Sequence, residues 1–386
     1  MQSTKDKNII LIFDTSIDGH HLEYIHHLYT ANENIGEDIV FCIPEGFKRV
    51  KGNFEWPSKE NVSFHFLPDK VCENLKGLGR LQFARRATAL LKESCDEVKP
   101  DAVFLISILQ LLPFLPLAFI GRKEKISGII YKIYLYSWKN YSLIEKLFET
   151  IRFMSSRLSK NIKTIFVLND EVSARRLNMV WNCKKFVSLP DPFQSKAQNI
   201  SFNKPLLNGT KIKVLHFGGL ARRKGTLEIM RTIEELCAND KAAPYQFVFA
   251  GKVNSDIREE FYNSYNKLKD QCDILVMDKF CSYEELDELC RECDIILAPY
   301  QNVHSSSGVI GYAAKFHKPV VVPNDGLLGK LVRKYKLGVA INNIASSSLY
   351  KLLTTYKVIP TDDKLEDEYI KVNSIVNFNK TIYNNL

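Results

Sequence analysis

Residues 214–225 read VLHFGGLARRKG: a short apolar run, two glycines and a cluster of cations, followed by a helical pattern. The apolar run predicts a buried strand. Gly218 and Gly219 allow the backbone to turn sharply and to approach a ligand with no Cβ in the way. Arg223 and Lys224 place positive charge beside the first amides of the next helix, an end that favours anions. This order is typical of a diphosphate site, although a tight turn with two solvated cations has the same pattern.

The size and composition of the chain predict a two-domain globular protein. Its 386 residues exceed one ordinary core, and 45% hydrophobic with 25% charged residues excludes disorder. The start, MQSTKDKNIILIFD, lacks the order of a signal peptide. We therefore expect the nine cysteines to be reduced thiols in a cytoplasmic protein. Cys290 and Cys293 form a CxxC inside a helical pattern, which indicates a buried helix face rather than metal or redox chemistry.

The excess of nine positive charges is uneven along the chain. Residues 122–163 hold ten cations and three acids, with aromatic and aliphatic residues interleaved. Such a segment suits anionic lipid headgroups or a phosphate-bearing acceptor, although a solvated basic face remains the alternative. No nucleic-acid motif accompanies the charge, so we do not expect nucleic acid as a partner.

Strand and helix patterns alternate throughout, which predicts parallel sheets flanked by helices. Residues 191–206 are polar and proline-containing and form the predicted linker. The linker separates an N-terminal domain, 1–190, from a C-terminal domain, 207–365. The final stretch, 366–386, has a helical pattern.

The longest apolar run, VFLISILQLLPFLPLAFI at 103–120, has nearly the length of a membrane span. Pro113 and Pro116 interrupt it. We therefore expect a buried strand followed by a helix; a helix dipping into a membrane and a true span are the alternatives.

Several motifs occur in an order that resembles the retaining GT-B glycosyltransferases of family 4, with this chain as a divergent subfamily. They are FVLNDEVSARRLN, VSLPDPF, VLHFGGLARRKGTLEIM, FVFAGKV, DKFCSYEELDELCRECDIILAPY and SSSGVIGYAAKFHKPVVVPNDG. The resemblance implies an α/β fold of two Rossmann-like parallel-sheet domains facing across a cleft. It also implies that the C-terminal helix crosses back to the N-terminal domain.

The resemblance assigns roles to individual residues. Lys224 matches the lysine that binds the donor diphosphate. Gly219 stands where the family often has an arginine, and Arg223, or secondarily Arg222, could compensate. The other implied donor-binding positions are Gly19, Gly218, Lys279, Phe280, Ser305, Ser306, Ser307, Gly308, Val309 and Tyr312.

The chain also departs from the family pattern. The two family glutamates, separated by seven intervening residues, fall on His304 and Tyr312. His304 joins Arg223 and Lys224 as a candidate catalytic residue, because it can still contact a sugar hydroxyl. For Tyr312 a partly buried core position is the alternative to a ribose contact. For Ser307 the alternative is a helix N-cap.

Asp18, His20 and His21 follow the first predicted strand and are candidate acceptor-binding residues. Four histidines crowd this helix, but neighbouring pairs point to different faces and no carboxylate completes a metal site. We expect no metal and no cofactor, only a nucleoside-diphosphate sugar as co-substrate.

The expected activity is transfer of that sugar to a lipid-linked glycan or polysaccharide acceptor. The expected location is cytoplasmic, with peripheral association with the inner face of the membrane. A GT-B epimerase or phosphorylase and a non-catalytic GT-B subunit remain as alternatives.

Overall fold

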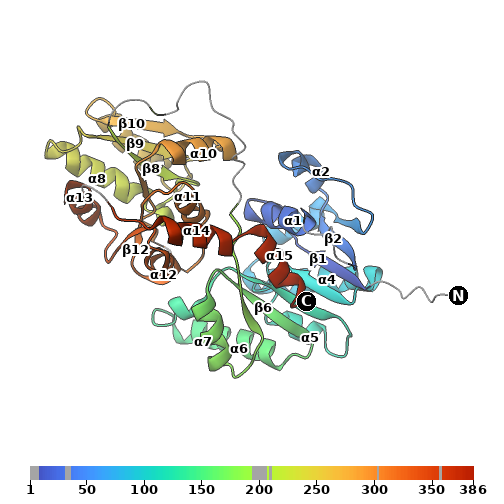
Figure 1. Ribbon diagram of the computed structural model, residues 1–386. Helices are drawn as coiled ribbons and strands as arrows, with labels where there is room; N and C mark the ends of the chain where they lie inside the picture. Colours follow the sequence, from blue (N-terminus) through green and yellow to red (C-terminus); the bar gives the residue numbers. More distant parts are fainter. Residues whose placement is uncertain (1–7, 31–35, 194–206, 208–210, 302–303, 356–358) are drawn as a thin grey trace. The chain divides into compact units, whose positions relative to one another are not determined.

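A computed structural model describes residues 8–30, 36–193, 207, 211–301, 304–355 and 359–386 (Figure 1). The chain divides into two compact units. Unit 1 comprises Met1–Pro190 and Ile375–Leu386, and unit 2 comprises Asp191–Ser374. Most of the predicted linker, 194–206, lies outside the described residues.

Unit 1 is built on a seven-stranded parallel sheet with the order β3-β2-β1-β4-β5-β6-β7. Its strands are β1 (Ile9–Phe13), β2 (Asp38–Pro44), β3 (Val62–Leu67), β4 (Ala102–Leu105), β5 (Lys125–Ile130), β6 (Ile162–Leu168) and β7 (Phe186–Leu189). Its helices are α1 (His20–Thr30), α2 (Phe47–Val50), α3 (Asp69–Lys76), α4 (Arg80–Val98), α5 (Phe114–Ala118), α6 (Leu143–Leu158), α7 (Glu171–Val180) and α15 (Ile375–Tyr383).

Alternate strand residues pack on opposite faces of this sheet because strand side chains have a period of two. Leu11 and Val103 belong to the core that also contains Leu91 of α4, Leu115 of α5 and Phe153 of α6. A second core on the other face joins strand residues to α1 and α15. Helices α4 to α7 therefore share one face of the sheet.

Unit 2 repeats the plan with a six-stranded parallel sheet in the order β10-β9-β8-β11-β12-β13. Its strands are β8 (Ile212–Phe217), β9 (Tyr245–Ala250), β10 (Asp273–Met277), β11 (Ile295–Leu297), β12 (Val320–Pro323) and β13 (Gly338–Ile341). Its helices are α8 (Thr226–Ala238), α9 (Arg258–Leu268), α10 (Tyr283–Glu292), α11 (Gly308–Lys315), α12 (Gly326–Tyr335), α13 (Ser346–Thr355) and α14 (Asp363–Val372).

In both units the strand order reverses beside the first strand, between β1 and β4 and between β8 and β11. Ligands of open parallel sheets bind at the carboxyl ends of the strands at such a switch point. The two fold halves therefore each present one candidate binding edge.

The end of the chain differs from the sequence expectation. Residues 366–386 were expected as one helix belonging with the N-terminal domain, but Asn373 and Ser374 separate two helices. The first, α14, belongs to unit 2, where Tyr369 packs edge-on against Tyr335 at 5.2 Å between ring centroids. Only α15 belongs to unit 1, where Phe378 stacks on Tyr24.

The apolar run 103–120 contains most of β4 and the short helix α5, a strand followed by a helix as expected. Among the described residues, no helix is long and apolar enough to cross a membrane.

Candidate functional site

The turn after β8 is fixed by close backbone contacts at two glycines. Gly218 has φ +95° and Gly251, at the end of β9, has φ +144°. A Cβ on Gly251 would lie 1.8 Å from the carbonyl oxygen of Gly218. Gly225 closes the same loop with φ +73°, and a Cβ there would lie 2.1 Å from the carbonyl oxygen of Pro299. Loop 218–225 thus rests against the ends of both neighbouring strands.

His216, which was not identified from the sequence, connects this loop to the neighbouring strand through hydrogen bonds. Its Nδ1 donates to the carbonyl of Leu297 at 2.8 Å, and its Nε2 lies 3.0 Å from the hydroxyl of Thr226. Thr226, the first residue of α8, also accepts from the amide of Ala221 at 3.1 Å. Burial lowers the pKa of His216 to about 4. A neutral ring therefore links β8, β11 and the start of α8, and the only sequence signal was a polar residue inside an apolar strand.

Lys224 lies at the switch point and contacts the end of β11. Its Nζ donates to the hydroxyl of Tyr300 at 2.8 Å and lies 4.2 Å from the centroid of that ring. The same hydroxyl lies 3.3 Å from Oγ of Ser307. The ammonium is also near the turn, since a Cβ on Gly218 would lie 3.8 Å from it. Tyr300 was missed in the sequence, although it follows a predicted strand in the motif IILAPY.

The structure separates the two neighbouring arginines. Arg222 donates to Glu260 at 2.9 Å and to the carbonyl of Asp256 at 3.4 Å, so its charge is engaged within the unit. Arg223 is exposed. Of the two, Arg223 is the one whose guanidinium is not committed to an ion pair among the described residues.

Residues 304–309 lead into α11, whose N-cap residue Ser307 lies beside Tyr300. Ser307 occupies the N-cap position, but its side chain makes no capping hydrogen bond. His304, Ser305 and Ser306 are half-buried, Gly308 is exposed and Val309 is buried.

Tyr312 lies in an aromatic cluster. It is 6% exposed and packs edge-on against Phe193 and Phe217, with ring centroids 4.5 and 5.2 Å away. The ring thus occupies the core position that the sequence left open as the alternative to a ribose contact.

The remaining predicted donor residues of unit 2 follow β10. Phe280 is 90% exposed, and the ammonium of Lys279 pairs with Glu285 of α10. An aromatic ring exposed to this extent is available to stack on a planar ligand.

The corresponding edge of unit 1 has a different chemistry. Asp14, at the end of β1, is buried and accepts from Nδ1 of His21 at 2.5 Å. Burial opposes a charge on His21, but the hydrogen bond and the charge of Asp14 raise its pKa above the usual value. The ring of His20 lies 4.6 Å from that of His21, and loss of hydration lowers its pKa to about 4. Asp14 was not identified from the sequence.

A pocket of about 210 Å³ opens at the carboxyl ends of β1, β2 and β3. Asp18 and Lys76 line it as an ion pair of 2.6 Å, and Arg49 and Asp69 line it as another of 2.7 Å. Gly19, with φ +56°, follows Asp18 and carries no neighbour within 4 Å of a notional Cβ. The pocket is polar with nearly balanced charge, so it suits hydroxyl groups better than a phosphate.

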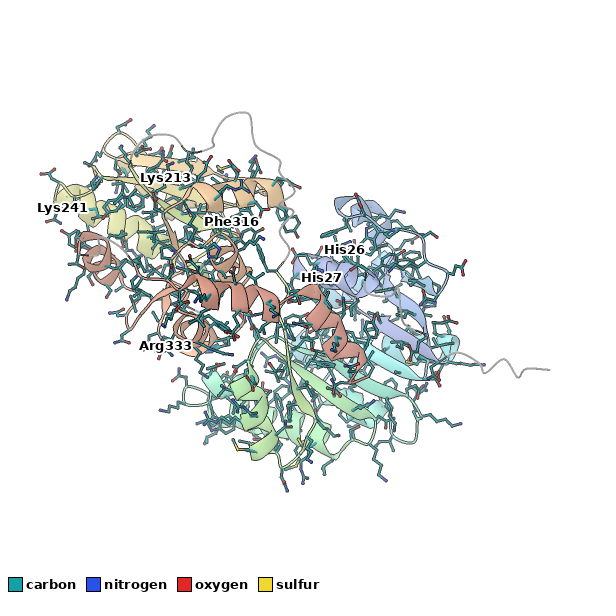
Figure 2. All side chains as sticks on the ribbon, in the orientation of Figure 1. His26, His27, Lys213, Lys241, Phe316 and Arg333 are labelled. Carbon is teal, nitrogen blue, oxygen red and sulfur yellow. The ribbon has the colours of Figure 1, made fainter. Side chains whose placement is uncertain are left out.

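Two of the crowded histidines of α1, His26 and His27, are labelled in Figure 2. Nε2 of His26 lies 3.1 Å from the carbonyl of Glu55, whereas His27 is 1% exposed and its pKa is lowered by burial to about 3. Elsewhere, in unit 2, ligand atoms of His317, Asp363 and Glu366 lie within 4.8 Å of one another. There His317 donates to Glu366 at 2.7 Å, which joins the end of α11 to α14.

The two edges therefore offer separate functions. Unit 2 presents an ammonium, an exposed guanidinium and helix-start amides, which stabilise negative charge. Unit 1 presents a histidine–aspartate pair and a polar pocket, which can hold and orient hydroxyls.

Comparisons with known proteins give a family match for part of the chain and solved structures of similar fold for nearly all of it. Residues 197–357 match the family model described as Glycosyl transferases group 1. No curated protein matches the chain.

Solved structures of similar fold cover nearly the whole chain. Anabaena Alr3699/HepE, crystallised in complex with UDP, shares 14% identity over 98% of each chain with a TM-score of 0.68. The trehalose-6-phosphate synthase OtsA shares 11% identity over 98% of each chain with a TM-score of 0.69. WaaG, a glycosyltransferase involved in lipopolysaccharide biosynthesis, shares 12% identity over 97% of this chain and 98% of its own, with a TM-score of 0.66. The fold is therefore GT-B, and the family match links residues 197–357 to glycosyltransferases.

Proposed function

We propose that this chain is a retaining glycosyltransferase of the family 4 type that transfers a sugar from a nucleoside-diphosphate sugar to an acceptor hydroxyl. The observation that carries the proposal is the contact of Lys224 with Tyr300 and, through it, Ser307 at the switch point of unit 2. An ammonium held in this way beside a tight glycine turn is positioned for a diphosphate.

In the transfer, the acceptor oxygen forms a bond to the anomeric carbon while the bond from that carbon to the diphosphate oxygen breaks. Negative charge then builds up on the leaving diphosphate. Lys224, Arg223 and the first amides of α11 stabilise that charge without reorganising, which is the largest catalytic contribution available to a fixed site. The acceptor proton leaves to a phosphate oxygen of the donor, which is the base expected for a retaining enzyme of this type.

Donor binding extends beyond the phosphates. Phe280 and Lys279 lie at the end of β10, where we propose that the base is bound. Residues 304–307 provide a histidine and three hydroxyls for the sugar, and we propose His304 as the group that replaces the first family glutamate. We assign no ribose contact to Tyr312, since its ring is packed among Phe193 and Phe217.

We propose that unit 1 binds the acceptor, a lipid-linked glycan or polysaccharide. The polar pocket beside Asp18 would hold acceptor hydroxyls, and the edge formed by Gly19, His20 and His21 would orient the attacking one. An acceptor of this class places the enzyme peripherally at the inner face of the membrane. The reaction needs no metal in this proposal, since cations of the protein supply the charge.

The direct test is to incubate the protein with a panel of nucleotide sugars and glycan acceptors. Turnover is measured as the release of nucleoside diphosphate. We expect release that depends on the acceptor and continues in EDTA, and a product whose anomeric configuration by NMR equals that of the donor. Inverted product contradicts retention, and loss of activity in EDTA contradicts metal independence. Product without acceptor would instead identify an epimerase, and nucleotide binding without any turnover would identify a non-catalytic GT-B subunit.

A further inference from the structure

Helix α6 has its polar and apolar sides reversed relative to an ordinary surface helix. Its buried side chains include the ion pair of Arg152 with Glu149, 2.6 Å apart, beside Phe153. Its outer side carries six large apolar residues that are between 41% and 84% exposed. They are Leu143, Ile144, Leu147, Ile151, Met154 and Leu158.

These six residues lie on one stripe of the helix. At about 100° per residue, their positions fall within a sector roughly 100° wide. A stripe of this width is what a helix normally buries against a core, yet here the structure leaves it exposed. We call it the α6 stripe.

The same face of unit 1 carries further exposed apolar side chains. Helices α5, α6 and α7 all pack on one side of the sheet, where they lie near one another in Figure 1. Leu117 of α5 is 64% exposed, Ile120 just beyond it 73%, and Met179 of α7 74%. Exposed apolar surface gathered over neighbouring helices marks an interaction site.

Charge around the α6 stripe is positive because cations outnumber acids in residues 122–163, and two of the three acids are buried in ion pairs. Glu124 is buried and pairs with Arg122 at 2.5 Å, just as Glu149 pairs with Arg152. The third acid, Glu145, is exposed and closes a capping box with Ser142 at the start of α6.

Exposed lysines flank the α6 stripe at both ends. Lys139 precedes the helix and Lys160 follows it, and both are exposed. Lys146 lies 5.8 Å from the ring of Trp138, itself 37% exposed. Apolar residues with a tryptophan and lysines at their margins match the layers of a bilayer surface, from acyl chains to anionic headgroups.

We propose that the α6 stripe docks unit 1 onto an anionic lipid surface, with the helix lying in the plane of the interface. Docking of this kind would deliver the enzyme to a lipid-linked acceptor, and its purpose therefore rests on the proposed function. Its physical basis is independent of the nucleotide-binding residues, all of which lie in other elements.

The test is co-sedimentation of the full-length protein with vesicles of phosphatidylcholine containing phosphatidylglycerol, compared with pure phosphatidylcholine. We expect binding to the anionic vesicles that weakens with salt. The double variant Leu147→Glu/Ile151→Glu should reduce the partition coefficient at least about tenfold, because it places two carboxylates on the stripe. The double variant Lys139→Glu/Lys160→Glu should reduce it by more than about fivefold at each site, because each change removes a positive charge and adds a negative one.

The matched control is Val376→Glu, which places a carboxylate on α15 at a position 73% exposed, and it should bind vesicles like the wild type. Binding of nucleoside diphosphates is measured on every variant and should not change. Absence of binding to anionic vesicles, or equal binding by the Leu147→Glu/Ile151→Glu variant, overturns the proposal. So does a wild-type dimer that this variant converts to monomers without lipid binding, since the stripe would then join two copies. If no nucleoside diphosphate binds the wild type or the variants, that result counts against the proposed function and leaves the lipid-docking proposal standing.

Discussion

The two parallel sheets follow the same topological rule, yet their switch-point edges carry opposite chemistry. In unit 2 the edge is basic, with the ammonium of Lys224 hydrogen-bonded to Tyr300. Its glycine turn is so close-packed that Gly251 has no room for a Cβ. In unit 1 the edge holds paired charges, such as Lys76 with Asp18, and the couple of His21 with Asp14. The fold supplies the position of a site, and a few side chains decide whether it suits a diphosphate or hydroxyls.

Substitution of Lys224 should produce the largest effect and would break the comparison most sharply. Lys224→Ala should lower kcat by about 10²–10³, the usual consequence of removing one preorganised electrostatic stabiliser. Lys76→Ala, which removes a cation from the edge of unit 1, should raise the KM for acceptor and leave nucleotide affinity unchanged. Arg222→Ala is the control within the loop, because Arg222 is paired with Glu260. Equal losses for Arg222→Ala and Lys224→Ala would show that the loop acts only through its net charge.

The glycine turn should be the next most sensitive feature. Gly251→Ala would force a Cβ to within 1.8 Å of the carbonyl oxygen of Gly218 at a φ of +144°. We expect a loss of about 3 kcal/mol or more in the free energy of unfolding, measured by denaturant titration. Gly219→Ala is the matched control, since a Cβ there meets no atom within 4 Å. It should unfold within about 0.5 kcal/mol of the wild type, and a larger loss would contradict this account of the turn.

Acid should weaken each unit through one buried histidine. The pKa values of His216 and His27 lie below the ordinary 6.5, at about 4 and about 3. Because the folded-state pKa is depressed, the stabilisation is fully present above pH 6.5 and is lost as the pH falls through the folded values. For His216 the limit is about 3 kcal/mol, from 1.36 kcal/mol per pKa unit.

Substituting each histidine in turn distinguishes the pH dependence of unit 1 from that of unit 2. His216→Gln keeps hydrogen-bonding atoms but does not titrate, so the stability of unit 2 should become flatter between pH 6.5 and 4. His27→Gln should do the same for unit 1. Both are followed by denaturant titration at several pH values, and an unchanged pH dependence in both variants would refute the assignment.

Among the four predicted effects, that of Tyr300→Phe should be the smallest. The variant keeps the ring beside the ammonium of Lys224 but loses the hydroxyl that bridges to Ser307. Removing one such hydrogen bond costs about 0.5–1.5 kcal/mol, which predicts a fall in kcat/KM of a few-fold to about tenfold. Ser305→Ala, on the same loop, serves as a comparison for a side chain without this bridge. A loss as large as that of Lys224→Ala would indicate that Tyr300 contacts the substrate.

Sequence reasoning predicted the features that depend on local pattern. The period of apolar residues predicted β8 and the alternation of elements, and glycines beside cations predicted loop 218–225. The chain end was wrong because a helical spacing cannot show the break at Asn373 and Ser374, which tertiary packing decides.

Contacts between residues far apart in the chain could not be predicted from local sequence patterns. Tyr300 lies 76 positions from Lys224, and His216 holds Thr226 and Leu297 through hydrogen bonds that no spacing rule encodes. Asp14 is only seven positions from His21, but a carboxylate at a strand end gives no sign of its partner. The exposed α6 stripe was hidden for a related reason, since a helical apolar pattern is ordinarily a buried one.

Calorimetric titration with nucleoside diphosphates, with the corresponding nucleosides for reference, tests the central claim most directly. We predict that at least one diphosphate binds the wild type more tightly than its nucleoside does, and that Lys224→Ala abolishes most of this difference. If no nucleoside diphosphate binds, or if Lys224→Ala binds the diphosphate as tightly as the wild type, the account of unit 2 as a diphosphate site is contradicted.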